Sequence, residues 1–343
     1  MNKSGEYPEK LLSCWHPVAY SSELSKDPIA SQLLNQKLVI WRTGDKRVHA
    51  MDDLCVHRGT ALSLGKVVDD CIMCPYHGWL YNESGQCTKI PQHESKSPIP
   101  DKAKIKTYKC QERYGLIWVA LREPVYPLPE VKELEASKKW KVVQTGPFEW
   151  NSDASRQVEN FTDFGHFPWV HPGLLGDEER TTVPDYKVKR EGHILHYTIK
   201  RPEAKNSEEF PIFANKEMSQ PERISRYELH LPYTIVLRLG WGEEKGMVYF
   251  FASGPLSKNK CRGYCIIGRN YDFDQPDKVL QDFEEVIFNQ DKKIVESQRP
   301  KQVPFSLKEE LHLDFDALAV HYRQGMVAEG LDYSFPEDDE EGE

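Results

Sequence analysis

Short hydrophobic runs separated by turn residues occupy the first third of the chain. Leu38–Arg42 and Arg47–Met51 are expected to be strands, joined by a turn at Thr43–Lys46. Further strand segments follow at Leu80–Cys87, as a hairpin, and at Leu116–Leu121. Runs of apolar and β-branched residues bounded by Gly, Asp or Asn are typical of strands. Many such strands in succession predict a small β domain that presents loops at its ends.

A proline-rich stretch, Pro124–Pro129, then interrupts this pattern and shows no strand alternation of its own. Proline removes a backbone donor and restricts the residue before it, so the stretch favours a linker. We therefore expect one domain at residues 1–123, a second at 124–335 and an acidic tail at 336–343. The density of charge in the tail predicts disorder.

The second part combines strand-like segments with one long helical segment. The helix is predicted over residues 276–298, because Leu280, Phe283 and Ile287 recur at helical spacing. The predicted strands cover residues 181–189, 193–200, 224–231, 234–240, 247–253 and 262–270. An antiparallel sheet followed by a long helix is an α+β arrangement.

Composition excludes several classes of protein. The 343 residues carry a net charge of −9, which argues against a nucleic-acid-binding protein. No run of about 18 apolar residues appears, so no membrane span is expected. The polar start, Met1–Glu6, lacks the apolar core of a signal peptide, and we expect a cytoplasmic protein. Its eight cysteines are then expected to be reduced rather than paired.

Two short loops each bring one cysteine and one histidine together, as Cys55-x-His57 and, after a spacer, as Cys74-x-x-His77. Such a set can hold a structural Zn²⁺. It can equally hold a Rieske [2Fe–2S] cluster, in which two His replace two Cys on one iron. The single residue between Cys55 and His57 is short for a zinc pair, and each loop mixes the two ligand types. The pattern favours the Rieske cluster.

A second group of candidate ligands follows the linker. A helix is predicted from Arg156 to about Phe164 and must end near Pro168. Asp163 and His166 are three residues apart and share a helix face, which suits a carboxylate that accepts a hydrogen bond from a metal-binding imidazole. His171 returns after the bend and can close on the same ion.

A carboxylate is needed to complete this site. Two imidazoles and one carboxylate with open positions are typical of non-haem Fe(II) oxygenases. Asp291 lies on the apolar stripe of the predicted long helix, four residues after Ile287 and three before Ile294. An acid that faces inward is costly unless it is paired or bound to metal. A solvated acid at the helix edge is the alternative for Asp291, and Asp314 and Asp316 are the competing ligands.

The motifs Cys-x-His-Arg-Gly at Cys55–Gly59 and Cys-Pro-Tyr-His-Gly-Trp at Cys74–Trp79 resemble those of the Rieske non-haem iron oxygenases, in particular the vanillate-demethylase-like group. The spacing in Asp163–His171 resembles the iron-binding motif of that family, and Gln290–Gln298 resembles its stretch with the carboxylate ligand. The resemblance therefore implies mononuclear iron held by His166, His171 and Asp291. It also implies a helix-grip fold for the second domain.

The resemblance further implies a head-to-tail homotrimer. In it, Asp163 bridges His166 and a cluster ligand of the neighbouring subunit, His77, while Glu159 and Asn160 line or support the iron site. Substrate walls are expected from the sheet, with these candidates: Arg201, Leu237, Leu239, Met247, Phe251 and Tyr271.

The activity implied is that of an oxygenase, which uses O₂ to hydroxylate or demethylate a small organic substrate at Fe(II). Its electrons come from a separate NAD(P)H-dependent reductase or a ferredoxin, since no Gly-x-Gly-x-x-Gly fingerprint appears in the chain. The alternatives are an aromatic-ring dioxygenase, a Rieske electron carrier and a zinc-stabilised ligand-binding module. The substrate stays open, although a faint resemblance points to the saxitoxin-pathway Rieske oxygenases.

Overall fold

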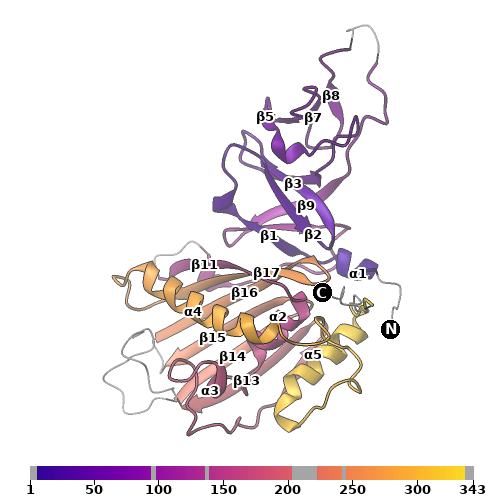
Figure 1. Cartoon of the computed structure of the whole chain (residues 1–343). Helices are drawn as coiled ribbons and strands as arrows, with labels where there is room; N and C mark the ends of the chain where they lie inside the picture. The colour runs from indigo at the N-terminus through magenta and orange to yellow at the C-terminus, as the bar shows by residue number, and fades with distance from the viewer. Residues whose placement is uncertain (1–5, 94–97, 136–138, 203–221, 242–244, 337–343) are drawn as a thin grey trace. The chain divides into compact units, whose positions relative to one another are not determined.

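A computed structural model describes residues 6–93, 98–135, 139–202, 222–241 and 245–336 (Figure 1). The chain divides into two compact units, one at Glu9–Leu128 and the other at Pro129–Glu343 together with the residues up to Pro8. The division falls in the proline-rich stretch. None of the helices in the described part of the chain combines the length and apolar character that crossing a lipid bilayer requires.

The unit at Glu9–Leu128 is built from two antiparallel sheets. A six-stranded sheet has the order β1-β10-β9-β4-β3-β2, and a four-stranded sheet has the order β5-β6-β7-β8. The strands are β1 His16–Tyr20, β2 Ile29–Leu33, β3 Gln36–Arg42, β4 Val48–Asp52, β5 Lys66–Val68, β6 Cys71–Met73, β7 Leu80–Tyr81, β8 Cys87–Lys89, β9 Thr107–Arg113 and β10 Leu116–Ala120. Short helical turns lie at α1 Glu9–Leu12, η1 Ser21–Glu23 and η2 Leu62–Leu64.

The side chains of Trp41, Ile72 and Tyr81 are fully buried in one hydrophobic cluster of this unit. Cys55 and Cys74 belong to the same cluster and are each 2% exposed. The loops that carry the Cys-His pairs are therefore attached to the core of the unit through their cysteines.

The second unit contains one seven-stranded antiparallel sheet in the order β11-β17-β16-β15-β14-β13-β12. Its strands are β11 Lys141–Trp150, β12 Lys189–Glu191, β13 Ile194–Pro202, β14 Glu222–His230, β15 Thr234–Trp241, β16 Lys245–Ser257 and β17 Lys260–Arg269. Its helices are α2 Ala154–Thr162, α3 Phe167–Val170, α4 Asp277–Val295 and α5 Ala317–Ala328, with 3₁₀ turns η3 Lys132–Leu134 and η5 Asp314–Asp316. The expected α+β class, with an antiparallel sheet and a long helix, is confirmed.

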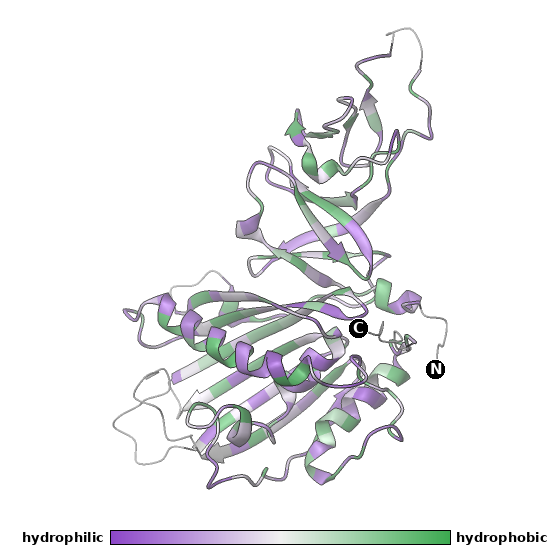
Figure 2. Ribbon diagram, viewed as in Figure 1, coloured by the Kyte–Doolittle hydropathy of each residue, from purple (hydrophilic) through white to green (hydrophobic). Residues whose placement is uncertain are grey.

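Helix α2 packs against β16 and β17, and helix α4 packs against β11. Asp153 caps α2 by accepting a hydrogen bond of 2.8 Å from the Ser155 backbone N–H, which satisfies one of the free donors at the helix start. The long helix α4 packs against β11, where Phe288 stacks on Phe148 with ring centroids 3.9 Å apart. Figure 2 shows hydrophobic residues along the strands and a mixture of polar and apolar turns on α4, as expected for a half-buried helix.

Some predicted elements are wrong. Residues 181–188 form no strand, and only Lys189 of that predicted segment belongs to β12. The Tyr186 hydroxyl instead bonds the Phe315 carbonyl and the Leu318 N–H, so this segment is held by tertiary contacts near α5. The apolar stripe of α4 also deviates, because Ile294 is 50% exposed and Val295 is the buried residue.

Other elements have no counterpart in the sequence prediction. Strand β11 contains Gly146-Pro147, which argues against a strand, but it lies at the sheet edge and shifts its register there. Helix α5 was not expected at all. At the start of the chain, Leu11 is fully buried in α1, so the residues from Glu9 onward are held by packing.

Candidate metal centres and an adjoining cavity

The two Cys-His loops have the same local geometry. The Gly59 N–H donates to the Cys55 carbonyl over 2.9 Å, and the Gly78 N–H donates to the Cys74 carbonyl over 3.0 Å. Both glycines have positive φ, +72° and +71°, a conformation that other residues adopt only with strain. The requirement for glycine at these positions is therefore visible in the backbone of the loops themselves.

The donor atoms of these loops fit a Rieske cluster. The ring centroids of His57 and His77 lie 4.6 Å apart, and both rings are half-buried, whereas the two cysteines are fully buried. Burial raises the pKa of the Cys74 thiol, so a metal cation is what would stabilise its thiolate. The buried Nδ1 of His57 finds no hydrogen-bond partner among the described residues. Soft thiolates inside and imidazoles toward the surface suit a cluster that exchanges electrons through its histidine-bound iron.

The second unit brings three further donors together at the ends of different elements. His166 and His171 flank α3, and Asp291 lies on α4. One atom from each residue lies within 4.8 Å of the other two. Asp291 Oδ1 is 2.9 Å from His171 Nε2 and 3.4 Å from His166 Nε2. The two imidazoles and the carboxylate converge on one point, as an iron site of the two-His-one-carboxylate type requires.

The outer nitrogens of both imidazoles are held by other side chains. His166 Nδ1 is 2.9 Å from Asp163 Oδ2, and His171 Nδ1 is 2.8 Å from Gln290 Oε1. Burial acts to raise the pKa of Asp163, but its hydrogen bond to His166 and the charge there hold the pKa below its ordinary value. With Nδ1 engaged, Nε2 of each ring faces the shared point. His171 Nε2 is buried and has no hydrogen bond of good geometry among the described residues, which fits a metal ligand.

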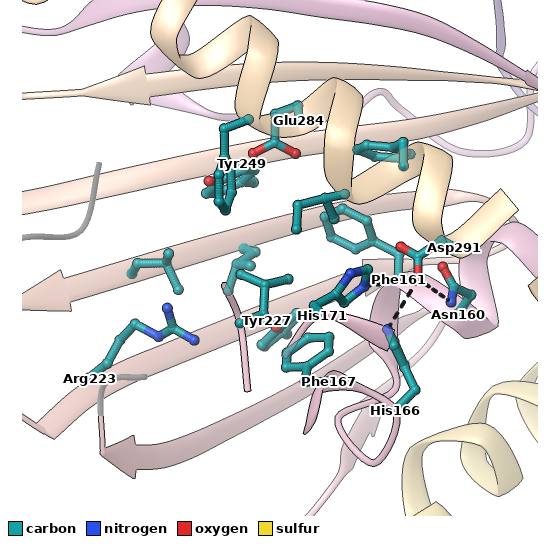
Figure 3. Close-up of a pocket in the computed structure, with 16 residues that line it drawn as sticks. Asn160, Phe161, His166, Phe167, His171, Arg223, Tyr227, Tyr249, Glu284 and Asp291 are labelled. Carbon is teal, nitrogen blue, oxygen red and sulfur yellow. Dashed lines mark hydrogen bonds and ion pairs between the residues drawn. The ribbon is translucent and has the colours of Figure 1, made fainter. Parts of the chain in front are cut away.

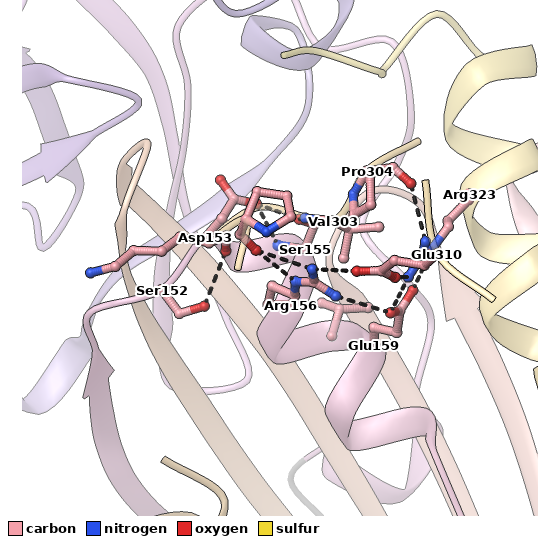
Figure 4. Close-up of polar contacts among 12 residues, drawn as sticks. Ser152, Asp153, Ser155, Arg156, Glu159, Val303, Pro304, Glu310 and Arg323 are labelled. Carbon is pink, nitrogen blue, oxygen red and sulfur yellow. Dashed lines mark hydrogen bonds and ion pairs between the residues drawn. The ribbon is translucent and has the colours of Figure 1, made fainter. Parts of the chain in front are cut away.

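Asn160 and Glu159 are neighbours in α2 but face different surroundings. The Asn160 amide donates to Asp291 Oδ1 over 3.2 Å, so it touches the carboxylate of the candidate iron site. Glu159 instead accepts from the Arg323 guanidinium over 2.6 and 2.9 Å. Figure 4 shows that Arg156 and Glu310 join it in one cluster of charges. Glu159 therefore supports the helix that carries Asn160 and does not contact the three donors in the described structure.

A cavity with about 630 Å³ of empty space, part of it open to solvent, adjoins the three donors (Figure 3). Mostly apolar and aromatic side chains line it: Asn160, Phe161, His166, Phe167, His171, Leu175, Arg223, Tyr227, Leu237, Leu239, Tyr249, Phe283, Glu284, Ile287, Phe288 and Asp291. Its mostly apolar lining with a few polar groups is typical of a site for a small organic molecule.

The candidates for substrate walls divide into three groups. Leu237 and Leu239 on β15 line the cavity. Met247, Phe251 and Tyr271 do not line it. The ring of Phe161 stacks on that of Phe251 with centroids 4.5 Å apart, so Phe161 covers Phe251 and forms the cavity wall there. The side chain of Arg201 lies outside the described residues.

Glu284 is the most important cavity residue that the sequence analysis did not identify. It lies on α4, is 3% exposed and points into the cavity beside Tyr249 (Figure 3). Burial raises the pKa of Glu284 to about 8, against a smaller opposing effect of its hydrogen bond to Tyr249. The signal was present in the sequence, because Glu284 lies seven residues before Asp291 and so on the same helix face.

Comparison with known proteins gives two family matches. Residues 14–109 match the Rieske [2Fe-2S] domain, and residues 150–328 match the vanillate O-demethylase oxygenase C-terminal domain. Among curated proteins, methylxanthine N1-demethylase NdmA of Pseudomonas putida is 33% identical over 329 residues, covering 92% of this chain and 88% of the relative. Methylxanthine N3-demethylase NdmB of the same species is 31% identical over 327 residues, with the same two coverages.

Solved structures agree with these matches. The structure of Pseudomonas putida CBB5 NdmA with caffeine superimposes with a TM-score of 0.83 at 31% identity, covering 96% of this chain and 98% of that chain. Dicamba monooxygenase bound to dicamba gives a TM-score of 0.79 at 21% identity over 94% of this chain and 98% of that chain, which shows a shared fold.

Proposed function

The chain belongs to the Rieske non-haem iron oxygenases with a vanillate O-demethylase-type C-terminal domain, and we propose that its substrate is a small, flat, nitrogen-containing ring compound that loses an N-methyl group. As a member of this family it is an oxidoreductase that uses O₂ and electrons from a separate reductase or ferredoxin to hydroxylate or demethylate a small organic molecule. When bound, the [2Fe–2S] cluster supplies single electrons and the mononuclear iron supplies the activation of O₂.

The proposal assigns the ligands residue by residue. The cluster is held by Cys55, His57, Cys74 and His77. The mononuclear iron is held by His166, His171 and Asp291, and the convergence of their donor atoms within 4.8 Å beside an apolar cavity is the observation that carries the proposal. His166, His171 and Asp291 all line the cavity, so a substrate bound there would lie beside the iron that these residues would hold.

The remaining residues orient and shield. Asp163 and Gln290 hold the outer nitrogens of the two imidazoles, which keeps each Nε2 directed at the metal position. Asn160 holds Asp291. The rings of Phe161 and Phe288 exclude water from the reacting carbon and offer flat surfaces to a planar substrate.

The choice of N-demethylation rests on the relatives named above, which act on methylxanthines. Hydroxylation of an N-methyl carbon takes one atom of O₂. The other atom leaves as water with two electrons and two protons. The resulting N-hydroxymethyl group then breaks its C–N bond and releases formaldehyde.

The test supplies the reconstituted protein with a separate reductase and NADH and offers caffeine, theobromine and ring compounds without N-methyl groups. We expect O₂ consumption matched by formaldehyde for at least one N-methylated ring. Product formation only from compounds without such a group would overturn the demethylase assignment while leaving the oxygenase class intact.

We also propose that the protein works as a head-to-tail homotrimer. Around the Cys-His loops, Val56, Leu64 and Tyr76 are 44%, 74% and 65% exposed. On the second unit, a surface hollow beside Asp163 and His166 is lined by Ile294 and Phe315, which are 50% and 46% exposed. Exposed apolar groups around both sites support docking of one subunit's cluster loops onto the next subunit's Asp163. NAD(P)H is then oxidised by another protein, which delivers electrons to the cluster.

A further inference from the structure

The cavity has a second polar end, away from the candidate iron site. Glu284 on α4 is 3% exposed and directs its carboxyl group into the cavity, with Tyr249 of β16 beside it (Figure 3). Nothing in the oxygenase chemistry described above uses this group. A carboxyl group without function in an apolar wall would be costly, because its polar atoms lose their contacts with water.

Building on the proposed function, we propose that the Glu284 carboxyl is the substrate anchor and donates a hydrogen bond to a carbonyl oxygen or ring nitrogen of a neutral, oxo-substituted heteroaromatic substrate. The anchor determines which compounds are accepted and which of their methyl groups reaches the iron. It is a binding residue and takes no part in oxygen chemistry.

The groups around Glu284 favour its neutral form. The titratable groups that interact electrostatically with Glu284 are Tyr249 on β16, Cys265 on β17 and Asp291 on the same helix. None of these three side chains is cationic, and Arg223 of β14 also lines the cavity. Burial is the main reason that the pKa of Glu284 is raised to about 8. At neutral pH the group is therefore mostly a protonated acid that offers one O–H donor.

The position of Glu284 also sets the size of the substrate. Seven residues separate it from Asp291, two helical turns that span roughly 10 Å along α4. A ligand held at Glu284 must bridge that distance to place a methyl group near the three donors. The aromatic rings of Phe161, Tyr227 and Phe288 line the same cavity, which suits one flat ring system rather than a flexible chain.

A neutral acid also discriminates between charge types. It binds an acceptor such as a lactam carbonyl without burying net charge. A carboxylate-bearing substrate offers acceptors too, but burying it would carry the cost of removing a net charge from water. A cationic substrate would bind only after Glu284 loses its proton, so its affinity would rise with pH.

The experiment measures caffeine binding by calorimetry from about pH 6 to about pH 10, a range in which caffeine does not titrate and Glu284 does. The protein is loaded with cluster and iron, and iron and sulfide contents are checked for each variant. The variants are Glu284→Gln, which keeps shape and a donor, Glu284→Leu, which removes the donor, and the exposed neighbour Glu285→Gln as the matched control.

For the wild type and Glu285→Gln, we expect affinity to be constant below pH 8 and to fall by up to tenfold per pH unit above it, because ionisation removes the donor. Glu284→Gln should bind at neutral pH nearly as well as the wild type but lose the pH dependence. Glu284→Leu should bind roughly fivefold to tenfold more weakly, the loss of one buried hydrogen bond.

Three results would overturn the anchor role. One is unchanged binding by Glu284→Leu, and another is an affinity that rises above pH 8, which would assign a cationic ligand to the site. The third needs no ligand: it is the lack, in the wild type at pH 7, of an infrared carbonyl band of a protonated carboxylic acid that disappears in Glu284→Gln. If caffeine does not bind but this band is found, the methylxanthine-like substrate class fails and the protonated state of Glu284 stands.

Discussion

At the scale of single residues, the two proposed iron-binding histidines differ in what orients them. His166 has a carboxylate at its outer nitrogen, and His171 has the amide oxygen of Gln290. A carboxylate makes an imidazole a stronger ligand than an amide does, and it can also take part in charge transfer to a neighbouring group. We therefore assign positioning to Gln290 and, in addition, communication with the cluster to Asp163.

The role of Gln290 can be tested against its neighbour on α4. Gln290→Ala should lower iron affinity about tenfold, because His171 loses the contact that fixes its ring and tautomer. Asn289→Ala, at an exposed position beside it, should leave iron affinity unchanged. Iron retention is measured during chelator titration, with the cluster absorbance as the internal standard. Equal iron loss from both variants would show that Gln290 acts only through helix stability.

Asp163→Asn should retain the cluster and the iron yet largely stop coupled turnover. The amide keeps the shape of the carboxylate, but it cannot supply the negative charge that holds the His166 contact and the proposed bridge to a neighbouring cluster ligand. The measurements are metal content, product formation and the ratio of O₂ consumed to product. Hydroxylation or demethylation at the wild-type rate would rule out the bridging role.

At the scale of elements, a buried cluster of charges connects α2 to α5. Arg323 of α5 is 1% exposed and binds both Glu159 of α2 and Glu310, while Arg156 of α2 binds Glu310 over 2.7 Å (Figure 4). Since α2 also carries Asn160, which contacts Asp291, this cluster fixes the helix on which one side of the site depends. The charges pair across segments far apart in the chain, so they specify one packing of the helices.

Arg323→Met should destabilise the fold by roughly 3 kcal/mol, because it leaves two mostly buried carboxylates short of a partner. The exposed pair Lys278–Asp282 is the control, and Lys278→Met should leave the free energy of unfolding nearly unchanged. Urea unfolding of the metal-loaded protein measures both. A loss for Arg323→Met no larger than that of the control would mean that the buried cluster contributes little.

The same cluster has a pH dependence with a definite sign. Burial acts to raise the pKa of Glu310, but the hydrogen bonds from Arg156 and Arg323 outweigh it and keep the pKa below the ordinary value. A group with a depressed folded pKa stabilises the protein above its unfolded pKa of about 4.3, and this contribution disappears as the pH falls through the folded pKa. Acid should therefore remove stability in the wild type that Arg323→Met already lacks.

At the scale of the whole molecule, the cluster of each chain in the proposed trimer serves the iron of one neighbour. The iron of the same chain is served by the cluster of the other neighbour. Cys74→Ser should abolish the cluster and His166→Ala the mononuclear iron, and each variant alone should be inactive. Co-assembled in equal amounts, they should recover about a quarter of the wild-type activity, the chance that an intact cluster faces an intact iron site. No recovery in a mixed assembly verified by mass spectrometry would mean that each chain serves its own iron.

The candidate metal ligands could be predicted from the sequence because most of them occur in short local motifs. Cys55 and His57, or Asp163 and His166, are so close in the chain that backbone geometry alone brings them together. The positive φ at Gly59 and Gly78 is likewise a local property of the loops. The strands β14, β15 and β17 also follow from local alternation of side chains. Residues 181–188 do not, because the tertiary contact of Tyr186 with Phe315 overrides the local pattern. Strand β11 tolerates Gly146-Pro147 because it lies at the sheet edge.

What the sequence by itself determined is therefore the fold class, the two sets of candidate ligands and the family that they resemble. Only the tertiary structure decided that Asp291 of α4, and neither Asp314 nor Asp316, lies with His166 and His171, and that Glu284 faces a cavity. The reason is physical: a carboxylate's partners and its degree of burial depend on segments more than a hundred residues away, and no local pattern records which of several acids the folded chain will enclose.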